Sequence, residues 1–238
     1  MPRHLVLRLD APLMSFGGDT VDNLGIVRDH PAQSMVAGLI GNALGYERFE
    51  GAALGRLQER IVMGSLRLRE GVRIQDFQTA QLDGGDRGWT TSGRFEGRRG
   101  GSGTYESSHI RYRDADADAI VVIVLRLEPA DEAPTLDDVK GALDSPERPL
   151  FIGRKPFIPS RPLASGWVDA IDIATALEAA IGERDDKSYR SQWPADESNR
   201  VGQRRQNLTD ERDWVAGVHT GRRAIAQGRL SANKATQS

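Results

Sequence analysis

Apolar residues alternate with other residues in several short stretches of the chain, and this spacing predicts β-strands. Leu5, Leu7 and Leu9 share one face of the first strand, and the apolar run that starts at Ala119 predicts a strand at the centre of a sheet. Further strands are expected at 61–69, 73–80 and 109–113, and helices at 34–46, 52–60 and 135–143. The order strand, helix, strand, strand, helix, strand is that of a ferredoxin-like or RRM-like α+β fold, which many RNA-binding domains and many unrelated proteins share.

The helix expected from Ser34 to Tyr46, with Ser34 near its N-cap, has glycines at 38, 41 and 45. These spacings of three and four residues place the glycines near one side of the helix. Each interior glycine costs about 1 kcal/mol relative to alanine, so a bare face indicates that another backbone or a nucleic-acid strand comes close. Close packing on a sheet is the alternative without a ligand. The spacing fits no dinucleotide fingerprint, and residues 1–139 lack the lysine that a P-loop needs.

The stretch from Leu82 to Ser108 interrupts this regular pattern. It contains eight glycines and almost no aliphatic side chains, and it predicts a long insertion without regular structure, which in a compact domain is either functional or disordered. Its arginines and aromatic residues are Arg87, Trp89, Arg94, Phe95, Arg98, Arg99 and Tyr105, and His109 and Arg111 follow at its base. Arginines for phosphates and aromatic rings for bases are what an arm that binds single-stranded nucleic acid requires. A surface loop without a ligand is the equally weighted alternative.

The character of the chain changes after residue 147. Four prolines in 149–162 predict an extended or turning path, and 148–163 carries Arg148, Arg154, Lys155 and Arg161 without an acidic residue. A helix is expected at 170–181, then a polar stretch, and a flexible tail at 224–238. We therefore expect an RRM-like domain over 1–147 with a thumb-like insertion at about 82–108, and a small, irregular, basic C-terminal region over 148–223 that packs on this domain.

Composition excludes several classes of chemistry. The 238 residues have a formal net charge of −2, which conceals the local basic stretches, and the absence of cysteine excludes disulfides and thiolate sites. Asp114, Asp116 and Asp118 alternate as in a calcium loop, but Ala119 stands where such a loop needs glycine, so we expect no metal and no cofactor. With neither a signal peptide nor an apolar run long enough to cross a bilayer, we expect a cytoplasmic protein without membrane contact.

Four features occur together in one order: the first strand with its Ala-Pro-Leu-Met-Ser-Phe-Gly loop, the helix with Pro31, Ser34 and three glycines, the glycine-rich insertion, and the segment Phe151-Ile-Gly-Arg-Lys-Pro. In this combination the chain resembles the fifth CRISPR-associated protein family of the RAMP superfamily, as represented by the CasD subunits of type I-E CRISPR surveillance (Cascade) complexes. The resemblance extends from about residue 4 to 220. The insertion is longer and richer in glycine than is usual in the family.

The resemblance implies a non-catalytic subunit that binds the 5′ handle of CRISPR RNA and caps the backbone filament, and so supports recognition of foreign DNA by the guide. The implied partners are CRISPR RNA, the backbone subunit CasC and the large subunit CasA, with target DNA contacted through the complex. Carried over by position, the handle-binding residues are Arg28, His30, Gln33, Ser34, Arg154 and Lys155. The thumb would press against the neighbouring backbone subunit and the guide strand.

Some relatives cut repeat RNA themselves, so a metal-independent endoribonuclease is the alternative function. Such cleavage needs a base, an acid and a cation at the phosphate. Among four histidines, only His109 with Tyr105 and Arg111 forms a plausible cluster, but Ser108 and Ile110 flank it where the nuclease relatives have a lysine. We therefore expect no catalytic residue, and a separate subunit to cut the RNA. A ferredoxin-like protein with a purely structural role would leave the basic segments unexplained.

Overall fold

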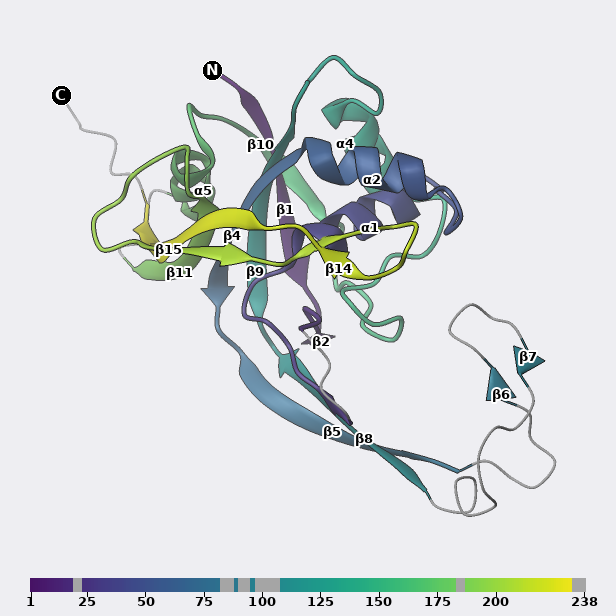
Figure 1. Cartoon of the computed structure of the whole chain (residues 1–238). Helices are drawn as coiled ribbons and strands as arrows, with labels where there is room; N and C mark the ends of the chain where they lie inside the picture. The colour runs from purple at the N-terminus through teal and green to yellow at the C-terminus, as the bar shows by residue number, and fades with distance from the viewer. Residues whose placement is uncertain (19–22, 82–87, 90–94, 97–107, 183–186, 233–238) are drawn as a thin grey trace.

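The computed structural model describes residues 1–18, 23–81, 88–89, 95–96, 108–182 and 187–232 (Figure 1). A seven-stranded sheet has the strand order β10-β1-β9-β4-β11-β15-β12, with antiparallel pairing throughout. These strands are β10 (Ala164–Asp169), β1 (Arg3–Asp10), β9 (Ile120–Leu127), β4 (Ile61–Arg69), β11 (Ser188–Pro194), β15 (Arg223–Ser231) and β12 (Arg204–Leu208). The first four, taken in chain order, give the ferredoxin-like arrangement, so the predicted α+β fold is confirmed.

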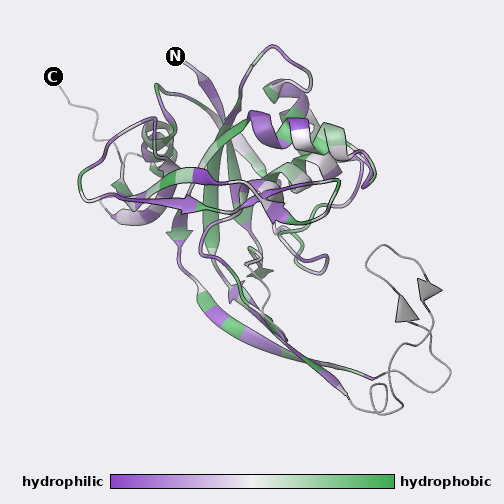
Figure 2. Ribbon diagram, in the orientation of Figure 1, coloured by the Kyte–Doolittle hydropathy of each residue, from purple (hydrophilic) through white to green (hydrophobic). Residues whose placement is uncertain are grey.

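Helices cover both faces of this sheet. Leu5, Leu7 and Leu9 point into a core with α1 (Gln33–Ala43), α2 (Gly51–Arg60) and α4 (Leu136–Asp144). On the other face, Val6 and Val124 pack against α5 (Ile173–Ile181). The central strands are accordingly apolar on both sides (Figure 2). An RRM binds RNA on an uncovered sheet face, whereas α5 covers the corresponding surface here, so this face is not open to a ligand.

The glycine face of α1 serves close packing. A Cβ at Gly41 would lie 2.5 Å from Cδ2 of Leu54 on α2, and one at Gly38 would lie 3.2 Å from the ring of Trp214. The prediction of Ser34 near the N-cap is wrong, because the helix begins at Gln33 and its N-cap, Ala32, provides no side-chain bond. Asp210 takes over this role from 177 residues away: its carboxylate accepts from the backbone N–H of Gln33 at 3.2 Å.

A long hairpin projects from the sheet between β4 and β9 (Figure 1). Its strands, β5 (Val72–Ala80) and β8 (His109–Ala117), pair from Val72 with Ala117 to Ala80 with His109. The alternating aspartates Asp114 and Asp116 belong to β8, and the chain turns at Asp118, whose φ is +54°. Short strands β2 (Leu13–Met14) and β3 (Leu24–Gly25) pair with β8 at the base.

The predicted insertion at 82–108 lies outside the described residues except for Ser108 and a two-stranded ladder. That ladder joins β6 (Gly88–Trp89) to β7 (Phe95–Glu96). The hairpin that carries the insertion is longer than predicted, since it already begins at Val72.

The C-terminal part is more regular than expected. Instead of forming a separate irregular region, it adds β10, β11, β12 and β15 to the main sheet. The prediction of a flexible tail from residue 224 is wrong for residues 224–231. These residues belong to β15, and Ala226 and Leu230 are buried in the core with α5. A small hairpin of β13 (Glu211–Arg212) and β14 (His219–Thr220) lies beside α1. Among the described helices, none has the length and apolarity that crossing a bilayer requires.

Candidate nucleic-acid interface

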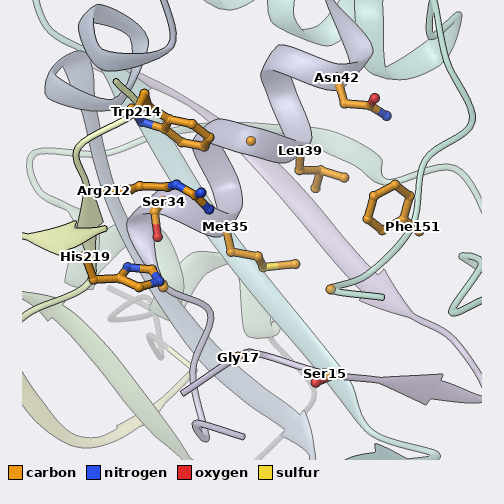
Figure 3. Close-up of a pocket in the computed structure, with 13 residues that line it drawn as sticks. Ser15, Gly17, Ser34, Met35, Leu39, Asn42, Phe151, Arg212, Trp214 and His219 are labelled. Carbon is orange, nitrogen blue, oxygen red and sulfur yellow. The ribbon is translucent and has the colours of Figure 1, made fainter. Parts of the chain in front are cut away.

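Two adjoining cavities lie between α1, the loop after β1 and the base of the projecting hairpin. The arginine cavity, about 250 Å³, is lined by Arg111, Arg113 and Arg154. The tryptophan cavity, about 360 Å³, is lined by Trp214, Arg212 and the start of α1 (Figure 3). Both share the backbone around Ser15, Gly17 and Gly153. We refer to the two adjoining cavities together as the groove.

The shared wall of the two cavities is built from two loops in close contact. Gly153 has a φ of +87°, and a Cβ at this position would collide with the carbonyl oxygen of Ser15. The backbone N–H of Ser15 also donates to the carbonyl of Ile152 at 3.2 Å. Only glycine combines this left-handed conformation with this close approach. The Gly-Arg-Lys segment is therefore fixed against the loop after β1, and Arg154 is held at the groove.

The arginine cavity concentrates positive charge. Its three arginines come from two elements, and among the described residues no carboxylate lines it. Arg154 donates to the carbonyl of Asp114 at 3.0 Å, and its guanidinium lies 5.6 Å from the ring centre of Phe157. Burial, and then the neighbouring Arg113, lower the pKa of Arg154. The charges of Asp76 and Asp114 act on the pKa of Arg154 in the opposite direction, but neither carboxylate lines the cavity. Three arginines around one cavity, in a chain of net charge −2, make a candidate site for anions such as phosphates.

The tryptophan cavity combines an apolar floor with polar edges. Met35, Gly38, Leu39 and Phe151 supply apolar surface, and Ser34, Asn42 and His219 supply hydrogen-bonding groups, again with no carboxylate in the described lining. The guanidinium of Arg212 lies 5.4 Å from the ring centre of Trp214. Figure 3 shows both side chains directed toward α1 from the β13 side. An indole ring beside a cation suits a planar, electron-rich group such as a nucleobase next to its phosphate.

The predicted handle-binding residues divide into two groups. Arg154, Ser34 and the exposed Lys155 lie in or beside the groove. Arg28 lies outside the groove and lines a third cavity together with Leu208 and Thr209. Its guanidinium donates to the carbonyl of Thr209 at 3.1 Å. Direct RNA contact by these residues stays a prediction.

His30 and Gln33 have structural surroundings instead. Nδ1 of the buried His30 lies 2.9 Å from Oγ of Ser65, and burial, followed by the charge of Arg67, lowers its pKa to about 4. The side chain of Gln33 turns inward and donates to the carbonyls of Gln58 and Ile61 at 2.7 and 2.9 Å. Both side chains are thus used in holding α1 and the sheet together, which argues against a direct role in binding phosphates.

The basic stretch 148–163 is also divided by its contacts. Arg148 donates to the carbonyls of Tyr46 and Gly45 and pairs with Glu47, while Arg161 pairs with Asp10 at 3.1 Å. These two charges are compensated within the protein. Arg154 and Lys155 are the members of the stretch that remain for an external anion.

Of the predicted thumb residues, His109 and Arg111 are exposed on β8 and share a face of the hairpin with Arg113, because alternate strand residues point the same way. For the other predicted thumb residues, and for Tyr105, the position or the side chain lies outside the part of the chain that the structure describes. These thumb residues are Arg87, Trp89, Arg94, Phe95, Arg98 and Arg99. Sequence reasoning missed Arg113, Arg212, Trp214 and His219 as site residues. The spacing Arg212-x-Trp214, a cation beside an aromatic ring, is the same signal that singled out the insertion.

Comparison with known proteins defines the class. A family model described as CRISPR-associated protein (Cas_Cas5) matches residues 4–225, so the chain belongs to this Cas5 family. A search of curated proteins found no match. The fold is similar to a chain of a solved "CRISPR RNA-guided surveillance complex" (TM-score 0.68, 19% identity, 96% of this chain and 90% of the other). It is also similar to a "Crystal structure of Cas protein" (TM-score 0.61, 23% identity, 97% and 96%). The expected family is confirmed at this level.

Proposed function

We propose that the protein is the Cas5-type subunit of a type I-E CRISPR surveillance complex and binds the 5′ handle of CRISPR RNA in the groove described above. The observation that carries the proposal is the row of arginines in a groove whose described lining has no carboxylate. Membership of the Cas5 family supports the CRISPR assignment. The similarity to a chain of an RNA-guided surveillance complex supports membership of such an assembly.

In this proposal the two cavities bind different parts of the RNA. Arg111, Arg113 and Arg154 contact phosphates, and the ring of Trp214 stacks with an unstacked base in the adjoining cavity. Single-stranded RNA suits this arrangement because its bases are free to leave the backbone path, whereas the sheet face is covered by α5. The affinity is therefore mostly electrostatic, with one stacking contribution.

The projecting hairpin is proposed to contact the neighbouring protein subunits of the complex, the CasC and CasA subunits. Its surface supports this: Phe77 and Ile110 are exposed, and the rings of Phe77 and Tyr112 are 5.5 Å apart. Exposed apolar side chains on an arm are typical of a protein contact. Its basic face, with Arg111 and Arg113, is turned toward the groove residues.

We propose that this subunit does not cut RNA. His4 and His30 are buried, and the pKa of each is lowered mainly by that burial, so neither suits acid–base chemistry near neutral pH. His109 lies at the exposed base of the insertion, and Nδ1 of His219 lies 3.2 Å from the carbonyl of Glu211. Endoribonuclease activity centred on His109 is the alternative that the experiment has to separate.

The test measures binding of the purified chain to RNA from its CRISPR repeat over a range of salt concentrations, in EDTA. We expect affinity to fall steeply with salt, and Arg154→Ala or Lys155→Ala to reduce the slope of log K against log salt by about 0.7 each. Lys140→Ala is the matched control, since Lys140 pairs with Asp144 on α4. Salt-independent binding, or no binding, would contradict the proposal. Intact bound RNA supports a scaffold, and a product with one defined 5′ end supports the nuclease.

A further inference from the structure

Gln58 on α2 bonds to the part of the chain that carries Arg212 and Trp214. Its Oε1 accepts from the backbone N–H of Arg212 at 3.1 Å and from the indole N–H of Trp214 at 3.2 Å. Its Nε2 donates to the carbonyl of Arg212 at 3.1 Å. One side chain therefore fixes both polar groups of the Arg212 backbone and the only polar atom of the Trp214 side chain.

These hydrogen bonds fix the positions of Arg212 and Trp214, which form one wall of the tryptophan cavity. The indole ring of Trp214 lies against the bare surface of Gly38, 3.2 Å from the position of a Cβ. The guanidinium of Arg212 lies over the same ring. If the indole N–H loses its partner, the ring is free to turn about its side-chain bonds, and both the stacking surface and the cation move with it.

Gln58 is itself held firmly. It is 6% exposed, and its backbone carbonyl accepts from the side chain of Gln33 at 2.7 Å. It does not line either cavity of the groove. It connects the consecutive helices α1 and α2 with the β13 segment, which follows 154 residues later in the chain.

We propose that Gln58 is a positioning residue for RNA binding, which acts through Arg212 and Trp214 and does not touch the RNA. This inference rests on the proposed function, because it assumes that RNA occupies the tryptophan cavity. It predicts a specific coupling. Removing the Gln58 side chain weakens RNA binding when Trp214 is present and has little effect when Trp214 has been replaced.

The test is a double-mutant cycle on RNA affinity, with Gln58→Ala, Trp214→Ala and the double variant. Pre-organised base stacking contributes on the order of tenfold or more in affinity, so we expect Gln58→Ala to weaken binding about tenfold. In the Trp214→Ala background the same change should have an effect of less than about twofold. Equal fold-losses in both backgrounds, or no loss in the single variant, would overturn the inference.

A matched control separates positioning from general destabilisation. Gln203→Ala removes a glutamine whose Oε1 likewise accepts a backbone N–H, that of Arg200 at 2.9 Å, away from the groove. It should leave RNA affinity unchanged. All affinities are measured below the unfolding transition of each variant, followed by circular dichroism. If Gln58→Ala does not fold, Gln58→Met retains the side-chain volume without the hydrogen bonds and enters the same cycle.

The outcome for this inference is distinguishable from that of the proposed function. If the wild-type chain binds RNA with the expected salt dependence but Gln58→Ala and Gln58→Met bind as tightly, the positioning role is wrong and the proposed function stands. If the wild-type chain binds no RNA, both are wrong.

Discussion

The carbonyl oxygen of Ser15 lies in the space that a β-carbon on Gly153 would need. This contact joins the loop after β1 to the Gly-Arg-Lys segment and forms the wall shared by both cavities. Gly153 is therefore required for the shape of the groove, whether or not it contacts a ligand itself.

We expect Gly153→Ala to lower the free energy of unfolding by about 2–3 kcal/mol, because alanine is strained at a φ of +87° and collides with Ser15. RNA affinity should fall as well, since Arg154 is displaced. Chemical denaturation measures the first effect. Gly55→Ala on α2 is the control: its Cβ enters open space, and it should stabilise the helix by up to about 1 kcal/mol. A Gly153→Ala protein as stable as wild type would contradict the expectation.

Asp210 should be important for stability, because it is fully buried, caps α1 and pairs with Arg223 at 2.6 Å. The amide of Asp210→Asn can still accept from Gln33 but leaves Arg223 without its counter-ion, which should cost roughly 3 kcal/mol in urea unfolding. Asp213→Asn is matched, since its oxygen can still accept from Val215 and Ala216 as the carboxylate does. It should change stability by less than about 0.5 kcal/mol. Equal losses in the two variants would argue against a special contribution of the buried ion pair between Asp210 and Arg223.

Stability should fall on acidification because of His30. Its pKa of about 4 in the folded chain lies below its ordinary value of 6.5, so the unfolded chain binds more protons between these values. The contribution is present above pH 6.5 and is lost as pH falls toward 4, by up to about 3 kcal/mol. His30→Asn should flatten the curve of unfolding free energy against pH over this range. His4, whose pKa is also lowered from 6.5 mainly by burial, remains in the variant and gives a residual slope in this range. Asp29 and Glu70, whose pKa values are lowered through Arg190, add a slope at the acidic end.

The arginines on β8 should contribute to RNA binding additively. We expect Arg111→Ala and Arg113→Ala each to reduce the salt slope by about 0.7, as for single-stranded nucleic acid. Arg69→Ala serves as the control because Arg69 is exposed but pairs with Asp118 at the turn between β8 and β9. Fluorescence anisotropy of labelled RNA at several salt concentrations measures the slopes. A slope that is unchanged in both hairpin variants would place the RNA elsewhere.

The sequence alone predicted those strands and helices whose pattern lies in residues that are close together in the chain. The alternation of Leu5, Leu7 and Leu9 and the apolar run of β9 identify central strands, because burial on both sides requires such residues. The strand β15 was missed: Ile225 and Leu230 are its only large aliphatic side chains, and its place in the sheet depends on pairing with β11 and β12. Propensity does not reveal such non-local pairing.

The site was predictable only in part for the same reason. Composition marks 148–163 as basic, but it does not reveal that Arg148 is bonded to the end of α1 while Arg154 faces the groove. The cap of α1 by Asp210 and the wall formed by Arg212 and Trp214 depend on contacts across more than 150 residues. Hydrophobic periodicity and residue spacing within a short window of the sequence do not predict such contacts.

The helix α5 on the second face of the sheet has a consequence for how such proteins diverge. With both faces sealed, the lining of the two cavities comes from loops, from α1 and from the hairpins of β5 with β8 and of β13 with β14, outside the seven-stranded sheet. Under the proposed function, substitutions in the loops and hairpins of this lining change RNA recognition without altering the seven-stranded sheet. The sheet can then stay constant while these segments diverge with the repeat sequence.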